Sequence, residues 1–222
     1  MEDASKAPKI RIHCDGLCEP NPGGLATYGF GIEEQDEASW REIHRAKGIA
    51  ARGQGATNNV AEYTAAIRAL RWLADEHRTG ASIALYSDSQ LLVNQLSGKW
   101  RVKSPQIRPL WSEARELLDS FADSRSIWVP REQNEPADGL SVEVYVSTLE
   151  AERAELAREV SVVMLRPGLY LADRRHQVNV PLGLCSCRDF KKLNSGRFRV
   201  RCEHLIAAGY SEASPVHDSF KG

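Results

Sequence analysis

The fold of this chain is decided near its start, in the stretch Lys9-Ile-Arg-Ile-His-Cys-Asp-Gly-Leu-Cys-Glu-Pro-Asn-Pro-Gly-Gly24. Residues 9–14 alternate apolar and polar side chains in the manner of a β-strand. The run Glu19–Gly24 contains two prolines and two glycines, which are typical of a turn. Thr27–Ile32 then carries aromatic side chains and predicts a second strand that returns as a hairpin.

Beyond this hairpin the pattern changes to alternating helices and strands. Residues 41–49 predict a third strand, and from Thr57 onward apolar residues follow a helical period. Further short elements are expected at Ser82–Tyr86, Ser89–Leu96, Leu110–Ala122 and Ser126–Val129, with a last helix opening at Pro136. The order predicts an α/β fold, a mixed five-stranded sheet flanked by helices.

The last third of the chain is organised differently. Glu150–Val160 is rich in Ala, Glu and Arg and predicts a connecting helix. After it we expect a small β-hairpin and helix domain, with strands at Val160–Leu165, Leu169–Ala172 and Gln177–Val180 and a closing helix at Cys202–Ala208. We therefore predict a large domain over residues 1–148, a connecting helix or linker over 149–160, and a small domain over 161–222.

Composition limits the classes of function. The chain has 222 residues, 42% of them hydrophobic, and a formal net charge of −1, which indicates no overall preference for nucleic acid or membranes. No run approaches the roughly 18 apolar residues of a membrane helix. The N-terminus is polar, so we expect no secretory signal and a cytoplasmic location, where five cysteines would not form a disulfide framework.

Four acidic residues stand at the ends of predicted elements. Asp15 is expected to close the first strand, Glu62 to lie in the first helical turn, Asp88 to end a buried strand, and Asp138 to begin the last helix. Taken singly, Glu62 or Asp138 could be a helix-dipole or cap partner. If the four ends converge, their mutual repulsion would keep one or more of them protonated unless a cation neutralised them. Hard oxygen ligands of this kind suit a pair of Mg²⁺ or Mn²⁺ ions.

The strings around these acids match one family motif by motif. They are Asp15-Gly-Leu-Cys-Glu-Pro-Asn-Pro-Gly-Gly24, Thr57-Asn-Asn-Val-Ala-Glu62, Ser87-Asp-Ser-Gln90 and Asn134-Glu-Pro-Ala-Asp138. Their order and spacing, over residues 9–148, resemble those of type 1 ribonuclease H. The resemblance implies an endoribonuclease that hydrolyses the RNA strand of RNA–DNA hybrids with two metal ions.

The same resemblance implies residue roles. Asp15 would bridge both metals, Asp138 would share the ion that holds the attacking water, and Glu62 and Asp88 would share the other. Two alternatives stay open: a nuclease that also acts on double-stranded RNA or RNA–DNA junctions, and a catalytically inactive hybrid-binding module. All four acids are present, which argues against the inactive module.

Substrate contacts follow from the resemblance as well. Asn58 and Asn59, with the turn at Asn21–Gly24, would lie along the minor groove of the hybrid, where 2′-hydroxyls distinguish RNA from DNA. Their position also suits helix capping. We expect the protein to bind the hybrid as a monomer, with no membrane partner.

The sequence departs from the family pattern in two places. Many members carry a histidine in the loop before the last acid, thought to help product leave, whereas Val129–Asn134 has none. Arg131 could substitute as a phosphate or product contact, or simply be exposed to solvent. Some members also insert a basic helical handle between the third and fourth motifs, and the corresponding stretch here, Lys99–Pro105, is too short for it. Trp100, which lies among three cations of this stretch, could form a reduced contact with the hybrid or could belong to the core.

Cysteines near the end of the chain suggest a second metal site. Three thiolates and one imidazole have the composition of a closed structural zinc site, and they are Cys185, Cys187, Cys202 and His204. Free core thiols are the alternative. For Cys14 and Cys18, which flank Asp15, ordinary core packing is the expectation.

The Cys-x-Cys and Cys-x-His pairs, with Asp-Phe after the first and Leu-Ile-Ala-Ala after the second, resemble a SWIM zinc finger over residues 161–210. The resemblance implies DNA or protein binding. Charge favours nucleic acid, because residues 174–201 hold eight cations against one acid, Asp189. The basic loop expected at Arg188–Arg201 could equally be a solvated surface.

Overall fold

The computed structural model describes residues 8–37, 39–194 and 198–209. They form two compact units, Met1–Tyr145 and Val146–Gly222, and each unit is considered by itself. Within the described residues, no helix combines the length and apolar character needed to cross a membrane.

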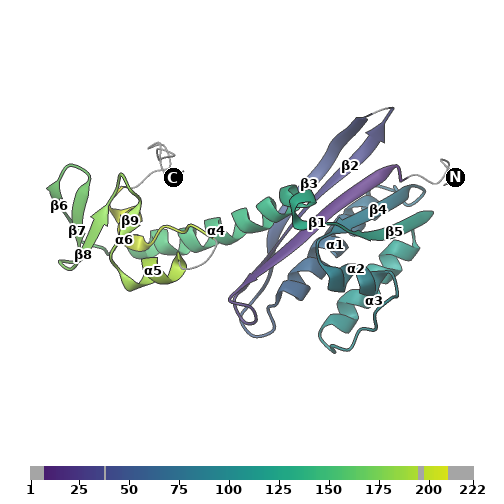
Figure 1. The fold of residues 1–222 in the computed structure, drawn as a ribbon, viewed down its shortest axis with the longest axis horizontal. Coiled ribbons are helices and arrows are strands. Elements are labelled where there is room, and N and C mark those ends of the chain that lie inside the picture. Colours follow the sequence, from purple (N-terminus) through teal and green to yellow (C-terminus); the bar gives the residue numbers. More distant parts are fainter. Residues whose placement is uncertain (1–7, 38, 195–197, 210–222) are drawn as a thin grey trace. The chain divides into compact units, whose positions relative to one another are not determined.

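The N-terminal unit is built on one mixed sheet of five strands in the order β3-β2-β1-β4-β5 (Figure 1). The strands are β1 Ile10–Glu19, β2 Leu25–Asp36, β3 Ser39–Arg52, β4 Ser82–Ser87 and β5 Asp123–Trp128. β1 and β2 pair antiparallel, as do β2 and β3, whereas β1 and β4, and β4 and β5, pair parallel. The predicted mixed five-stranded sheet is therefore confirmed.

Four helices and a short 3₁₀ turn complete this unit. They are α1 Asn58–Asp75, α2 Gln90–Leu96, α3 Ile107–Asp119, the 3₁₀ turn Arg131–Gln133, and α4 Glu135–Ala157, which continues into the C-terminal unit. The hydroxyls of Thr57 and Ser89 cap the first two helices by accepting from backbone N–H groups at 3.1 and 3.2 Å. Their apolar faces bury a core with β1 and β4 that includes Leu70, Leu92 and Ile12.

The C-terminal unit has a smaller sheet in the order β6-β7-β8-β9. Its elements are β6 Val162–Arg166, β7 Leu169–Ala172, β8 His176–Asn179, β9 Leu184–Cys185, α5 Arg188–Leu193 and α6 Glu203–Ala207. The predicted hairpin, third strand and closing helix are all present. Three of the six buried residues that form its core are cysteines: Cys185, Cys187 and Cys202.

Several predicted boundaries shift by a few residues, and three differences from the structure bear on the candidate sites. β1 continues to Glu19, because its antiparallel pairing with β2 extends to the turn, so Asp15 lies inside the strand and does not close it. The last helix and the connecting helix are one element, since nothing in α4 interrupts the helical backbone between Glu135 and Ala157. The expected basic loop contains α5, whose first turn is fixed by Cys187; residues 195–197 of that loop lie outside the described residues.

Candidate active site and cysteine–histidine cluster

Asp15 lies where the sheet changes from parallel to antiparallel pairing. The parallel register of β1 with β4 ends at the pair His13–Tyr86, whereas the antiparallel register with β2 continues through Asp15 and Gly29. Asp15 therefore stands just past the carboxyl end of the parallel pair, 6% exposed. Asp88 follows directly after β4 at the same end of the sheet.

Two glycines let helices approach β1 and β2 at this point. A Cβ on Gly16 would lie 2.3 Å from the backbone nitrogen of Glu62, and a Cβ on Gly29 would lie 2.7 Å from the carbonyl oxygen of Ala137. Only glycine leaves room for these contacts. Side chains of successive strand residues point to opposite faces, so the first turns of α1 and α4 are held against opposite faces of the sheet beside Asp15.

Neutral side chains orient three of the four carboxylates. The Ser89 hydroxyl donates to Glu62 Oε2 at 2.5 Å. The Asn134 amide nitrogen donates to Asp88 Oδ1 at 2.9 Å and to the carbonyl oxygen of Cys14 at 3.1 Å. The Ser141 hydroxyl is 3.3 Å from Asp15 Oδ2.

The fourth carboxylate, that of Asp138, is bound by a cation of the chain itself. The Arg131 guanidinium donates to Asp138 Oδ1, and the Arg131 side chain is half exposed. The Arg131 side chain therefore stands at the edge of the acidic cluster, and its partial exposure leaves both predicted alternatives open. A cation at this edge neutralises part of the charge of the site.

Burial and mutual repulsion hold protons on two of the acids. Burial, followed by the charges of Asp88 and Asp138, raises the pKa of Asp15 to about 7. Burial, followed by the charges of Asp15 and Asp88, raises the pKa of Glu62 to about 8 despite the hydrogen bond from Ser89. Four hard oxygen ligands with such an excess of negative charge fit divalent cations such as Mg²⁺ or Mn²⁺.

The two predicted substrate-binding asparagines have different settings. Asn58 Oδ1 accepts from the Cys18 backbone nitrogen at 2.6 Å, and the Asn58 backbone nitrogen donates to Asn21 Oδ1 at 3.2 Å. Asn58 therefore connects the turn at Asn21 to α1. Thr57 is the N-cap of α1, so the capping alternative for Asn58 and Asn59 is wrong. Both residues belong to the helix itself.

Asn59 lines a pocket of about 570 Å³ together with the short basic segment after α2. Trp100 is 48% exposed there and does not belong to the core. Lys99, Arg101 and Lys103 line the same pocket. An exposed aromatic ring among cations offers a surface for a base or sugar beside phosphates.

Sequence reasoning missed the residues that orient the carboxylates. Asn134 was quoted as the first residue of the fourth motif, but its bond to Asp88 depends on a contact 46 residues away. Ser141 could have been found, since it lies three residues after Asp138 on the same helix face. Ser89 follows Asp88 directly and belongs to the third motif, but the sequence indicates no bond from its hydroxyl to Glu62, 27 residues away.

The four predicted zinc ligands converge. All four are buried, and their ligand atoms lie within 4.8 Å of one another. Cys185 ends β9, Cys187 and Cys202 are the N-caps of α5 and α6, and His204 lies in the first turn of α6. Cys14 and Cys18, as expected, are buried in the other unit and outside this cluster.

The imidazole of His204 is set up as a ligand. Its Nε2 lies 3.2 Å from Asp173 Oδ2, while its Nδ1 is buried without a hydrogen bond, 3.4 Å from Glu203 Oε1. A metal-binding histidine usually gives its second nitrogen to a carboxylate in this way. Three thiols and one imidazole nitrogen have the composition of a tetrahedral zinc site, so the donor set fits Zn²⁺.

Comparison with known proteins gives consistent matches in the N-terminal part. A family model described as reverse transcriptase-like matches residues 44–144. The bifunctional protein Rv2228c of Mycobacterium tuberculosis is 38% identical over 135 residues, 60% of this chain and 34% of that protein. The ribonuclease H of Syntrophus aciditrophicus is 32% identical over 158 residues, 63% of this chain and 83% of that enzyme.

The chain spans about a third of the length of the mycobacterial relative.

Solved structures agree with the sequence matches. The N-terminal RNase H domain of Rv2228c has a TM-score of 0.58 at 32% identity, covering 66% of this chain and 99% of that one. A crystal structure of LC11-RNase H1 in complex with an RNA/DNA hybrid has a TM-score of 0.56 at 30% identity, covering 64% and 99%.

Proposed function

We propose that this chain, which belongs to the ribonuclease H family, is an endoribonuclease that hydrolyses the RNA strand of RNA–DNA hybrids. The observation that carries the proposal is that Asp15 lies near Asp88 and Asp138, and Glu62 near Asp15 and Asp88, closely enough for these charges to raise the pKa values of Asp15 and Glu62. The similarity to LC11-RNase H1, whose crystal structure contains an RNA/DNA hybrid, supports the choice of substrate.

In this proposal the four carboxylates hold two Mg²⁺ or Mn²⁺ ions. Asp15 would contribute to both positions, Asp138 to one of them, and Glu62 and Asp88 to the other. When bound, such ions supply an activated water and stabilise the leaving oxygen of the phosphodiester. Ser141, Ser89 and Asn134 keep the carboxylate oxygens oriented, as ligand-supporting residues do in other metal sites.

Arg131 is proposed to contact the scissile phosphate or the product. Its guanidinium already reaches the Asp138 carboxylate, so a modest rotation of an exposed side chain brings it to an anion bound there. This role replaces that of the loop histidine, which Val129–Asn134 lacks.

The hybrid is proposed to lie along the first turn of α1. Asn59 is placed there with Trp100 and its neighbouring cations around one pocket. Asn58 contributes by holding the Asn21 turn in position rather than through a free carboxamide oxygen. Contacts with 2′-hydroxyls would select RNA in the cleaved strand.

The C-terminal unit is proposed to be a SWIM-type finger that holds one structural Zn²⁺. The four converging ligands and the Asp173 contact to His204 support the metal. The cations of the finger, among them Arg188 and Lys192, support an auxiliary role in nucleic-acid binding. We keep the monomeric state, the cytoplasmic location and the boundaries of the domains as predictions.

The test of the activity is a side-by-side cleavage assay in Mg²⁺, in Mn²⁺ and with chelator. Substrates of one sequence are prepared as RNA–DNA hybrid, duplex RNA, an RNA–DNA junction and duplex DNA. We expect the hybrid to be cut fastest and cleavage to stop with chelator. Preferential cutting of duplex RNA or the junction would change the substrate, and binding without any cleavage would identify a hybrid-binding module.

A further inference from the structure

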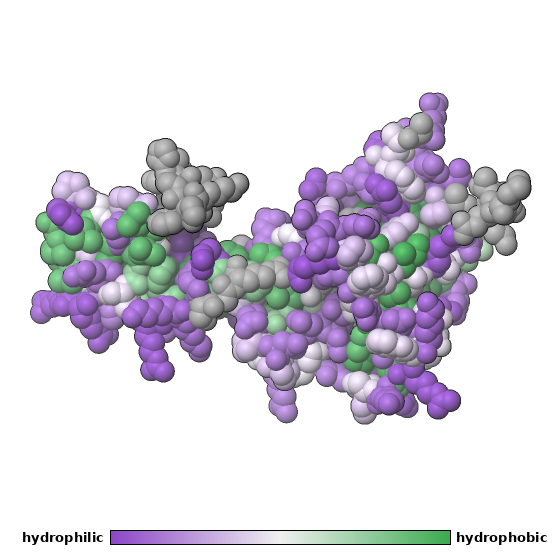
Figure 2. All heavy atoms as spheres, viewed as in Figure 1, coloured by the Kyte–Doolittle hydropathy of each residue, from purple (hydrophilic) through white to green (hydrophobic). Residues whose placement is uncertain are grey.

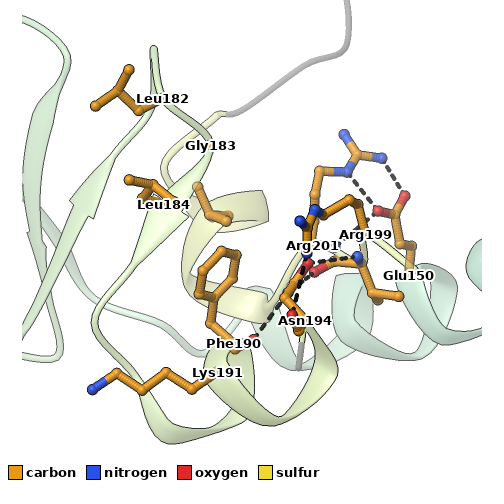
Figure 3. Close-up of a pocket in the computed structure, with 11 residues that line it drawn as sticks. Glu150, Leu182, Gly183, Leu184, Phe190, Lys191, Asn194, Arg199 and Arg201 are labelled. Atoms are coloured by element: carbon orange, nitrogen blue, oxygen red, sulfur yellow. Dashed lines mark hydrogen bonds and ion pairs between the residues drawn. The ribbon is translucent and has the colours of Figure 1, made fainter. Parts of the chain in front are cut away.

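The C-terminal unit contains a groove of about 690 Å³ that the nuclease proposal does not use. Figure 3 shows its walls, with Leu182, Gly183 and Leu184 on one side and the Glu150–Arg201 ion pair on the other. Phe190 projects between them from α5. A volume of this size accommodates two or three apolar side chains of a ligand.

The apolar part of the lining is aliphatic except for Phe190, and it is partly exposed. Leu182 and Leu184 are 62% and 49% exposed, large fractions for leucines, while Leu205 closes the floor at 1%. Figure 2 shows apolar side chains reaching the surface of this unit beside projecting hydrophilic ones. An apolar patch rimmed by polar residues is the usual character of a protein interaction site.

The polar groups inside the groove are already used by the protein. The Asn194 amide nitrogen donates to the carbonyl oxygens of Phe190 and Val200, each at 2.9 Å, and Asn194 Oδ1 accepts from the Val200 nitrogen at 3.2 Å. Arg201 Nε and Nη2 donate to the two oxygens of Glu150 at 3.0 and 2.6 Å. These groups hold the walls together and leave few donors for reading a ligand.

Positive charge remains at the rim. Among the described residues that line the groove, Glu150 is the one acid, and Arg201 neutralises it. Lys191 and Arg199 also line it and carry charges that this acid does not balance. The rim therefore attracts a ligand that is negatively charged beside an apolar anchor.

We propose that this groove is a docking site for a peptide segment that presents leucine-like side chains flanked by acidic residues. The apolar anchors fill the space between Leu184 and Phe190, and the acidic flanks meet Lys191 and Arg199. Such an arrangement has the apolar centre and charged rim of a protein interface. The site would connect the nuclease to a partner protein and does not depend on the activity of the N-terminal unit.

A protein fits this groove better than a nucleic acid does. Single-stranded nucleic acids stack their bases on exposed aromatic rings and read base edges with free polar groups. Three leucines and one valine supply most of the apolar side chains of this lining, Phe190 is the one aromatic ring among its described residues, and the Asn194 carboxamide is occupied. Lys191 and Arg199 alone would give only salt-sensitive contacts to phosphates.

The experiment uses the full chain loaded with zinc and three fluorescein-labelled peptides of twelve residues. The first has two leucines four residues apart among aspartates and glutamates, the second replaces the leucines by serines, and the third replaces the acids by lysines. Fluorescence anisotropy should show the first peptide binding at least tenfold more tightly than either of the others. Equal binding of the serine peptide would overturn the proposal, because the groove would then not recognise an apolar anchor.

Variants locate the binding. The double variant Leu182→Ser, Leu184→Ser alters exposed side chains, so it should fold normally while weakening the first peptide at least tenfold. Lys191→Glu, Arg199→Glu should weaken the first peptide and strengthen the lysine peptide. The matched controls Leu165→Ser and Arg166→Glu lie on β6, away from this lining, and should bind as the unchanged chain does.

Three results would contradict the proposal. The groove variants could retain zinc and thermal stability yet bind the acidic peptide as tightly as the controls. A single-stranded oligonucleotide of equal charge could compete for the groove more strongly than the peptide, which would assign it to nucleic acid. Sedimentation could show a dimer that the leucine variants dissociate, which would make a second copy of the chain the occupant.

Discussion

The two units of this protein each gather four potential metal ligands, but they do so on different foundations. In the N-terminal unit the carboxylates stand at the edge of a core of 21 buried residues that they do not help to form. In the C-terminal unit three of the ligands are half of the core. A metal bound at the first site would therefore serve catalysis, whereas a metal bound at the second would stabilise the folded unit.

The largest effect is expected where a ligand is removed from the first site. Asp15→Asn should lower the rate of hybrid cleavage by about 10³-fold, because the shared carboxylate no longer carries its charge. The variant should keep its thermal stability. Asp36→Asn, at the exposed end of β2, is the matched control and should cut normally. Near-normal cleavage by Asp15→Asn would remove the carboxylates from the mechanism.

Loss of a ligand from the second site should unfold its unit instead. Cys202→Ala should abolish stoichiometric zinc and destabilise the C-terminal unit by several kcal/mol, since binding of a structural metal is coupled to folding. Metal analysis with hydrogen exchange of β7 and β8 measures both effects. Cys18→Ala, a buried cysteine outside the cluster, should retain zinc.

The cleavage rate of the variant that lacks zinc tests whether the two sites are independent. Cys202→Ala should cut the hybrid within a few fold of the unchanged chain at low salt, because the carboxylate site has its own core. If zinc loss removed cleavage at low salt while the sheet of the N-terminal unit stayed protected, the two sites would be coupled and the contrast between them would fail.

A moderate effect is expected from residues that orient the carboxylates. Asn134→Ala removes the bonds to Asp88 and to the Cys14 carbonyl and should lower kcat by roughly 10–100-fold with little change in KM. Steady-state kinetics in Mg²⁺ measures the changes in kcat and in KM separately. Asn94→Ala, at a partly exposed asparagine whose side chain bonds within its own helix α2, serves as the control. A rise in KM with unchanged kcat would make Asn134 a substrate contact.

The smallest effect concerns stability without metal. Asp15 and Glu62 have folded-state pKa values of about 7 and 8, above the usual carboxyl range. The folded chain therefore binds more protons than the unfolded chain, and its stability is full near pH 4 and falls as the pH rises towards 8. In chelator, Glu62→Gln should raise stability at pH 8 by on the order of 1 kcal/mol and flatten this dependence, as followed by urea unfolding. An unchanged slope would contradict the raised pKa values.

Much of the fold was predictable because local patterns and tertiary structure agree. The turn at Glu19–Gly24 and the helical period that begins at Thr57 each mark boundaries that the structure confirms. The four acids were found because each stands in a motif that resembles those of one family, although Asp15 lies inside its strand and not at the end. Their roles as ligands remain a prediction that the geometry supports.

The features that the sequence analysis did not predict depend on contacts between residues far apart in the chain. The extent of β1 past Asp15 is set by its partner β2, which the residues of β1 do not encode alone. Helix α5 is only six residues long and rich in cations, and the Phe190 nitrogen bonded to Cys187 Sγ fixes its first turn. The groove of the C-terminal unit joins residues from Glu150 to Leu205, a juxtaposition that no local pattern reveals.

The most direct test of the account is strand-resolved cleavage of one RNA–DNA hybrid labelled on both strands. We predict that the unchanged chain in Mg²⁺ cuts only the RNA strand, at internal positions, and that chelator or Asp15→Asn stops the cutting. Cleavage of the DNA strand, or RNA cleavage that persists in chelator, would contradict a nuclease that works through these four carboxylates.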